Sequence, residues 1–198
     1  MTFYIPEYVK RIIERLEENG YEAYIVGGSV RDMLLGKEPK DYDVTTSAKP
    51  DEIEYIFKDF KRVNVGKKFG TIIVCQEEGD VEVTTFRKEG HYLDGRRPDW
   101  VTFSSSIEDD LSRRDFTINA IAYNEKKGII DPYKGQKDIS NRLIRTVGEP
   151  KERFSEDYLR ILRAVRFSAQ LGFNIEEETF KAAKIHSKIG RASCRERV

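Results

Sequence analysis

The sequence predicts an α/β (α+β) domain, in which helices flank a mixed sheet, followed by an all-α segment. Short apolar runs alternate with helical apolar periods in residues 1–140, and the pattern is helical from Arg142 onward. The charge balance changes at the same place. Residues 1–140 carry 22 Lys and Arg against 27 Asp and Glu, whereas residues 141–198 carry 13 against 8. The zero net charge of the chain therefore averages an acidic and a basic part and does not exclude an RNA partner.

The composition restricts the class of protein. A chain of 198 residues suffices for one domain, or one with an appendage, whose core needs no disulfide or metal. The 35% charged residues and the mean hydropathy of −0.62 exclude a membrane span, and the 38% hydrophobic residues argue against disorder. Two cysteines rule out a disulfide framework, and the first ten residues lack the pattern of a signal peptide, so we expect a cytoplasmic protein.

Apolar spacing and turn residues predict the elements in order. Helices are expected over residues 7–18, 29–35, 50–60 and from Ser104–Ser106 through Ala122, and strands over residues 23–26, 41–45, 62–65, 71–75 and 81–86. Asn19-Gly20 ends the first helix, and Ser29 is expected to cap the second. The stretch 87–100 is rich in Gly, Pro and charge, which predicts a loop.

Asp41 and Asp43 stand two residues apart on the predicted strand 41–45. Residues i and i+2 of a strand face the same side, so both carboxylates can reach one pair of cations while Tyr42 points away. Mg²⁺ prefers such oxygen ligands and commonly bridges carboxylates to substrate phosphates. Two Mg²⁺ ions there could activate an attacking hydroxyl and neutralise a leaving pyrophosphate. Taken alone, the pattern also fits a solvated strand end.

A glycine turn precedes this pair by a short span. Gly27 and Gly28 lie between a strand and a helix start, where backbone N–H groups favour an anion and no Cβ obstructs a phosphate. Arg31, one turn into the helix, could add a charged contact. Alone, two glycines before a helix are usually only a turn, and a dinucleotide-binding site would want a third spaced glycine. Glu82, on strand 81–86, is either a third acidic ligand or base, or part of a polar outward face.

Three longer motifs contain these residues. They are GGSVRDMLLG followed by DYD within residues 27–43, RRDFTINA at residues 113–120, and SEDYLRILRAVRF at residues 155–167. In order and spacing they resemble the motifs of the class II tRNA nucleotidyltransferases, the bacterial and eukaryotic CCA-adding enzymes with the related bacterial poly(A) polymerases. The resemblance implies a polymerase-beta-type nucleotidyltransferase head at residues 1–140 and a truncated helical neck at residues 141–188. Residues 189–198 form a tail without family resemblance, and either a foreign remnant or a shifted reading frame would explain it.

The resemblance also implies a role for each candidate residue. Asp41 and Asp43 would bind two Mg²⁺ ions, with Glu82 as the third acidic residue of the catalytic set. Gly28 and Arg31, beside Gly27, would hold the triphosphate, and Arg114 would contact the nucleotide. Asp115 and Asn119 would lie near the ribose. Asp157 and Arg160 would read the base, with support from Arg163 and Arg166.

A helical wheel separates charge from apolar residues in the last motif. Glu156, Asp157, Arg160 and Arg163 fall on one face, and Leu159, Leu162, Val165 and Ala169 lie opposite, with Arg166 on the apolar side. A charged stripe is usually a solvated face. An Asp can, however, accept from the exocyclic amino group of cytosine or adenine while an Arg donates to the ring nitrogen beside it. Uracil and guanine present a carbonyl there, and an unpaired buried polar group costs about 1–3 kcal/mol, roughly 10- to 100-fold in discrimination.

The activity implied by the resemblance is addition of C and A from CTP and ATP to the 3′ end of tRNA. An RNA 3′-hydroxyl would attack the α-phosphate and release pyrophosphate, with no membrane involved and the oligomeric state left open. A poly(A) polymerase, or a partial CC- or A-adding enzyme, shares every motif. A catalytically idle nucleotide- or RNA-binding fragment is the alternative from another class. Family members continue into body and tail domains, so a head and neck alone could bind nucleotide yet add it poorly.

Overall fold

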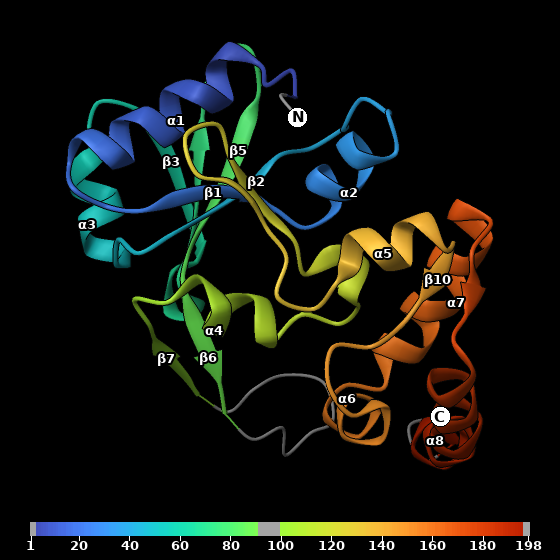
Figure 1. The fold of residues 1–198 in the computed structure, drawn as a ribbon. Helices are drawn as coiled ribbons and strands as arrows, with labels where there is room; N and C mark the ends of the chain where they lie inside the picture. Colours follow the sequence, from blue (N-terminus) through green and yellow to red (C-terminus); the bar gives the residue numbers. More distant parts are fainter. Residues whose placement is uncertain (1–2, 91–99, 196–198) are drawn as a thin grey trace.

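The structure, a computed structural model, describes residues 3–90 and 100–195. Its N-terminal part is built on a seven-stranded sheet with the strand order β3-β4-β5-β2-β1-β8-β9 (Figure 1). These strands are β1 Ala23–Val26, β2 Asp43–Thr46, β3 Lys61–Gly66, β4 Thr71–Cys75, β5 Asp80–Thr85, β8 Ala122–Asn124 and β9 Gly128–Ile130. All neighbouring pairs are antiparallel except β2 and β5, which confirms the predicted mixed sheet.

Helices flank this sheet because its inner strand β1 is buried on both faces. Ala23 and Ile25 enter one apolar cluster, whereas the alternate residues Tyr24 and Val26 enter another. The first cluster also holds apolar side chains of α1 (Glu7–Glu18), α2 (Gly28–Leu34) and α3 (Pro50–Ile56). The second holds those of α4 (Ile107–Ser112). The predicted helix 7–18 and strand 23–26 are confirmed to the residue.

The strand pairing brings three chain segments to one end of the sheet. In the antiparallel pair β1–β2, Val26 lies opposite Asp43. In the parallel pair β2–β5, Asp43 lies opposite Glu82. The end of β1, which leads into Gly27, therefore lies beside the start of β2 and the first half of β5.

Three predicted boundaries near this point are wrong. Helix α2 begins at Gly28, and Ser29 does not cap it, because its hydroxyl donates to the Val26 carbonyl (3.0 Å). Strand β2 begins at Asp43, so Asp41 lies just before the strand. Helix α3 ends at Ile56, because the chain turns after Phe57 and residue 61 already begins β3.

Residues 87–122 differ most from the prediction. Part of the expected loop 87–100 is strand β6 (Arg87–Glu89), which pairs with β7 (Val101–Phe103), and residues 91–99 lie outside the described ranges. The helix expected to run through Ala122 ends at Ser112 and is followed by a 3-10 turn, η2 (Thr117–Asn119), and strand β8. A short apolar run such as residues 120–123 has no period that separates helix from strand, and pairing with β1 decides the outcome.

The remaining elements follow β9 and lie on the right in Figure 1. They are α5 Gly135–Ser140, β10 Leu143–Ile144, α6 Pro150–Glu156, α7 Leu159–Leu171, β11 Asn174–Ile175 and α8 Glu177–Arg195. The segment is helical apart from the short parallel pair β10–β11, and α8 continues past residue 188, where the sequence predicts the neck to end. Within the described ranges, no helix has the length and apolar character needed to cross a bilayer.

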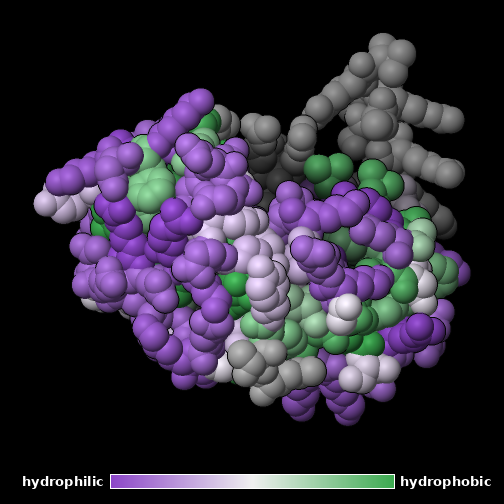
Figure 2. Space-filling model, turned by 90° about the horizontal axis from the view of Figure 1, so that it is seen from above, coloured by the Kyte–Doolittle hydropathy of each residue, from purple (hydrophilic) through white to green (hydrophobic). Residues whose placement is uncertain are grey.

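The surface differs between the two parts of the chain. In Figure 2 the surface over the N-terminal part is mostly hydrophilic, whereas hydrophobic patches appear between polar side chains over the C-terminal part on the right. On α7, Leu159, Leu162 and Val165 are 42%, 66% and 57% exposed, while Arg160 of the same helix is only 6% exposed. Helix α7 thus buries Arg160 together with Ala164 and Phe167 and leaves three large apolar side chains exposed, which an ordinary amphipathic helix would not do.

Candidate active site

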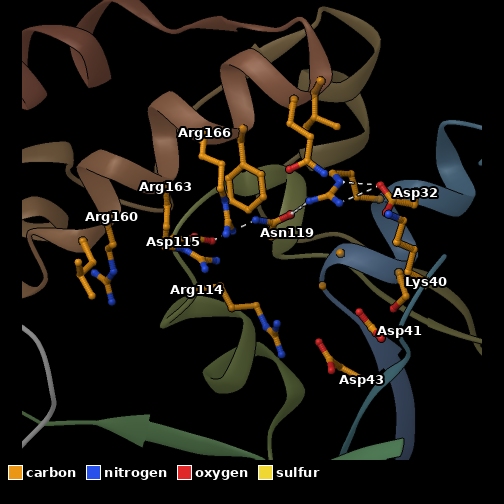
Figure 3. Close-up of a pocket in the computed structure, with 18 of the residues that line it drawn as sticks. Asp32, Lys40, Asp41, Asp43, Arg114, Asp115, Asn119, Arg160, Arg163 and Arg166 are labelled. Atoms are coloured by element: carbon orange, nitrogen blue, oxygen red, sulfur yellow. Dashed lines mark hydrogen bonds and ion pairs between the residues drawn. The ribbon is translucent and has the colours of Figure 1, made fainter. Parts of the chain in front are cut away.

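A cleft of about 880 Å³ lies between the end of the sheet and α7. Twelve of the thirteen predicted site residues line it: Gly27, Gly28, Arg31, Asp41, Asp43, Arg114, Asp115, Asn119, Asp157, Arg160, Arg163 and Arg166. Glu82 is not among the lining residues, although it is the register partner of Asp43 on β5. Figure 3 shows Asp41 and Asp43 on one side of the cleft and the arginines of α7 on the other.

Asp41 and Asp43 present their carboxylates side by side (Figure 3). Tyr42 between them is buried, with its ring edge-on to Tyr8 at 6.4 Å, so the alternation expected of a strand holds although Asp41 precedes β2. Within the described ranges, neither carboxylate has a hydrogen-bond or ion-pair partner, although both line the cleft. Nothing in this part of the chain neutralises their charge by direct contact.

Desolvation and neighbouring acidic groups raise the pKa of Asp43 and of Glu82. Asp43 is accessible from the cleft, yet the surrounding protein removes enough water that desolvation raises its pKa. Asp41 adds to this rise and the nearby Arg114 opposes it. The pKa of Glu82 is likewise raised, by desolvation and by the charge of Asp43. A cation held by oxygen ligands would relieve this repulsion, so the residues fit a hard divalent metal ion.

The protein alone supplies few ligands for such an ion. Among the described residues, no group of three or more His, Cys, Asp and Glu side chains has a metal-binding arrangement. The candidate ligands are therefore the two aspartates, and further oxygen ligands would have to come from water or a bound phosphate, as is common for Mg²⁺.

The raised pKa of Asp43 has a consequence for stability. A carboxyl group whose pKa is higher in the folded than in the unfolded state binds its proton more tightly when folded, so its contribution to stability falls as pH rises through the folded pKa. Without divalent metal, we expect Asp43→Asn to melt at a higher temperature than the wild type at neutral pH. The difference should shrink as pH falls through the titration range of Asp43. Thermal unfolding at several pH values measures this, and an Asn variant less stable at neutral pH contradicts it.

Two guanidinium groups flank the glycine turn beside these carboxylates. Gly27 has φ +80°, which favours glycine, and a Cβ there would lie 3.1 Å from Nη1 of Arg114. A Cβ on Gly28 would lie 3.5 Å from Nη2 of Arg31. Arg31 is buried and forms an ion pair with Asp32 at 2.8 Å, which holds its guanidinium group in place. The turn therefore combines bare backbone with two positive charges, the environment a phosphate group favours.

A buried carboxylate that the sequence reasoning missed holds Arg114. Asp110 on α4 is fully buried, and its two oxygens accept from Arg113 (2.8 Å) and Arg114 (3.0 Å). Burial alone would raise the pKa of Asp110, but these two arginines hold it below its ordinary value. Arg113 also contacts Glu89 of β6 at 3.0 Å. The spacing of Asp110 and Arg114, at i and i+4, was the available signal in the sequence.

A chain of hydrogen bonds crosses the cleft floor from α2 to α7. Arg31 donates to Asn119 (2.9 Å), and Asn119 donates to Asp115 (3.2 Å). The second oxygen of Asp115 accepts from Nε of Arg163 at 2.6 Å. Asp115 and Asn119, predicted to lie near a ribose, thus also hold two arginines from different helices, Arg31 of α2 and Arg163 of α7. Figure 3 shows Asp115 beside Arg163.

The predicted base-reading residues sit at a break between two helices. Asp157 is extended, with φ −143° and ψ 106°, and its Oδ1 accepts from the Leu159 backbone N–H (2.9 Å) at the start of α7. Arg160 is buried, donates to the Arg153 carbonyl (3.1 Å) and forms an ion pair with Glu156. Arg166 is exposed and lines the cleft, as does Leu159, although the helical wheel placed both on the apolar side. The continuous helix assumed for the wheel is wrong at Asp157.

The fold and the cleft define a class of protein: a nucleotidyltransferase head with two neighbouring aspartates at the start of the central strand β2, joined to helices that carry arginines into the same cleft. Residues 23–145 match the poly(A) polymerase head domain. The chain belongs to this family, and the relatives described below are CCA-adding enzymes. The family membership that the sequence motifs predict is therefore confirmed. The enzymes of the family are generally metal-dependent nucleotidyltransferases.

The relatives are considerably longer than this chain. It is 57% identical over 171 residues to a CCA-adding enzyme of Geobacillus thermodenitrificans (strain NG80-2), covering 86% of this chain and 42% of the relative. The crystal structure of the Bacillus stearothermophilus CCA-adding enzyme in complex with CTP has a TM-score of 0.81 and 46% identity, covering 90% of this chain and 43% of that one. The Thermotoga maritima CCA-adding enzyme complexed with tRNA-CCA has a TM-score of 0.77 and 30% identity, covering 94% and 43%. The chain thus spans less than half the length of these relatives.

Proposed function

We propose that the protein adds C and A from CTP and ATP to the 3′ end of tRNA, without a nucleic-acid template, in the cytoplasm. The observation that carries this proposal is one cleft that brings together Asp41 and Asp43, which have no ion-pair partner among the described residues, a glycine turn flanked by guanidinium groups, and the arginines of α7. Relatives that are named CCA-adding enzymes, one solved with CTP and one with tRNA, support the choice of substrates.

The reaction joins the RNA 3′-oxygen to the α-phosphorus of the nucleotide and breaks the bond to the bridging oxygen, so that pyrophosphate leaves. Asp41 and Asp43 would hold Mg²⁺, two ions in this proposal, with Glu82 close to the same strand end. When bound, Mg²⁺ supplies Lewis-acid activation of the hydroxyl and neutralises charge on the phosphates. Gly28 and Arg31 hold the triphosphate, Arg114 contacts it beside Gly27, and Asp115 with Asn119 lies near the ribose.

Base choice is assigned to the start of α7. Asp157 accepts from the exocyclic amino group that cytosine and adenine share, and Arg160 donates to the adjacent ring nitrogen. The helix break supports this role, because one oxygen of Asp157 is fixed by the Leu159 N–H and the side chain lines the cleft. Arg163 and Arg166 support the pair from the next turn of the same helix.

Asp157→Asn should relax discrimination against UTP and GTP by roughly 10- to 100-fold, because it converts one acceptor into a donor. The Asn side chain keeps an oxygen that can accept from the Leu159 N–H, so the start of α7 is retained. Kinetics of addition with each of the four nucleotides measures the effect. Glu152→Gln, an exposed change on α6, is the control and should leave selectivity unchanged. Unaltered rejection of UTP and GTP in Asp157→Asn removes the base-reading assignment.

Incubation with tRNA that lacks CCA, followed by sequencing of the new 3′ ends, tests the whole function. We expect C, C and A in that order from CTP and ATP. Runs of A on unrelated RNA would instead identify a poly(A) polymerase, and addition that stops after two C residues or supplies only A would identify a partial enzyme. Nucleotide binding without any addition, in a form extended to the length of the relatives, would identify an idle binding module.

A further inference from the structure

The ring of Phe167 lies where three arginines of the cleft meet. The guanidinium carbons of Arg31, Arg163 and Arg166 lie 5.3, 5.3 and 5.0 Å from its centroid. Arg163 and Arg166 belong to α7, like Phe167 itself, whereas Arg31 comes from α2. Phe167 is only 6% exposed, so most of its surface is in contact with other protein groups.

Three positive charges around one ring repel one another, so attractive contacts must offset this repulsion. Asp32 pairs with Arg31, and Asp115 pairs with Arg163. Arg166 forms no ion pair within the described ranges. The negative face of an aromatic ring attracts a guanidinium group within about 6 Å of the centroid, and this attraction grows when water is excluded. The buried ring of Phe167 therefore attracts all three guanidinium groups, including that of Arg166, which no carboxylate of the described residues pairs with.

The ring itself is fixed by the hydrophobic core. Phe116 meets it edge to face, with centroids 5.9 Å apart and planes at 87°. Both rings belong to the largest apolar cluster of the described residues, which also contains side chains of α1, α2 and the sheet. The core thus determines where the ring lies, and the ring determines where the guanidinium groups can rest.

We propose that Phe167 is a positioning residue that holds the guanidinium group of Arg31 against α7 and directs it toward the glycine turn. Arg31 lies beside Gly28, so displacing it would move a positive charge away from the phosphate site. The hydrogen bond from Arg31 to Asn119 holds the same guanidinium group from the other side. The inference rests on the proposed function, because it takes Arg31 as a contact of the triphosphate.

Phe167→Leu in the 198-residue chain tests this inference, with CTP and inorganic tripolyphosphate as probes. We expect both to bind about three- to tenfold more weakly, the range of a cation–π contact of a partly desolvated arginine. An equal loss for both probes is the signature of a displaced Arg31, because tripolyphosphate has no base. A loss confined to CTP would show instead that the ring acts through the base-side arginines Arg163 and Arg166 and not through Arg31, and would overturn the proposal.

Phe173→Leu is the matched control. Phe173 belongs to the same apolar cluster and is 4% exposed, but no guanidinium group lies over its ring among the described contacts. Phe173→Leu should lose stability as Phe167→Leu does, but its affinities for CTP and tripolyphosphate should be those of the wild type. Equal affinities in the two Leu variants overturn the proposal. Phe167→Met, which fills the space without a ring, replaces Phe167→Leu if that variant does not fold.

The Arg31→Ala variant separates failure of this inference from failure of the proposed function. If Arg31→Ala leaves tripolyphosphate affinity unchanged, the triphosphate assignment itself is wrong. If Arg31→Ala weakens tripolyphosphate affinity while Phe167→Leu and Phe173→Leu bind tripolyphosphate equally well, only the positioning role of Phe167 is wrong. With both correct, Phe167→Leu should change affinity less than twofold in the Arg31→Ala background, because the group that the ring positions is gone.

Discussion

Asp43→Asn and Asp41→Asn should each reduce nucleotide addition by at least about 100-fold, the scale seen when one oriented electrostatic group is removed from an active site. The Asn side chain keeps the shape but loses the charge that a divalent cation requires. Because neither carboxylate has a protein partner in the described ranges, the fold should not suffer. Single-turnover addition to tRNA lacking CCA measures the loss.

The control for this result is Asp51→Asn at the start of α3. Asp51 is exposed and does not line the cleft, so its replacement should leave the rate unchanged. Titration with Mg²⁺ adds a second readout, since a ligand that binds only the folded state raises its melting temperature. Mg²⁺ should stabilise the wild type more than Asp43→Asn. Activity within tenfold of the wild type in both Asn variants would contradict the assignment of the metal ligands.

Asp110→Ala should lower the free energy of unfolding by about 3–5 kcal/mol, the cost of removing one partner from a buried ion pair. Asp110 is fully buried and is shared by Arg113 and Arg114, so its loss leaves two guanidinium groups without their anion. Because its folded pKa is lowered, the stabilisation is present above the unfolded pKa and is lost as pH falls through the folded pKa. The gap between wild type and variant should therefore close in acid.

Asp109→Ala is the comparison for Asp110, because the two residues are neighbours on α4. Asp109 is half-buried and pairs with Lys88 at the surface, and exposed pairs contribute about 0–1 kcal/mol. Chemical denaturation of the three proteins gives both values. Equal stability of Asp110→Ala and Asp109→Ala would show that the buried cluster is not what holds Arg114 in place.

The sequence predicted elements well where a local period was matched by burial. Helix α1 has four buried apolar residues at helical spacing, and β1 is a short apolar run between turns. Residues 120–122 were wrongly predicted as helix, because only the pairing of β8 with β1 distinguishes this apolar run from a helix. The hairpin of β6 and β7 was also missed, since its strands are three residues long and Arg87–Glu89 is charged.

The candidate site was predictable where chemistry lies in short motifs, as for Asp41, Asp43 and the glycine turn. Asp110 was missed although its partners Arg113 and Arg114 are local, because its complete burial is a property of the folded chain. Phe167 was missed because only folding brings Arg31 of α2 over its ring. Which residues of α7 face the protein and which face solvent could also not be predicted from the local sequence. Arg160 and Arg163 are held by carboxylates of other elements, Glu156 of α6 and Asp115, which only the folded chain brings to them.

A crystal structure of this protein with CTP and Mn²⁺ tests the central claim most directly, since Mn²⁺ takes the same oxygen ligands as Mg²⁺ and gives an anomalous signal. We expect an anomalous peak in contact with Asp41 and Asp43, the triphosphate against Gly28 and Arg31, and the amino edge of cytosine facing Asp157. A nucleotide bound outside the cleft, or Mn²⁺ bound away from both aspartates, would contradict the account.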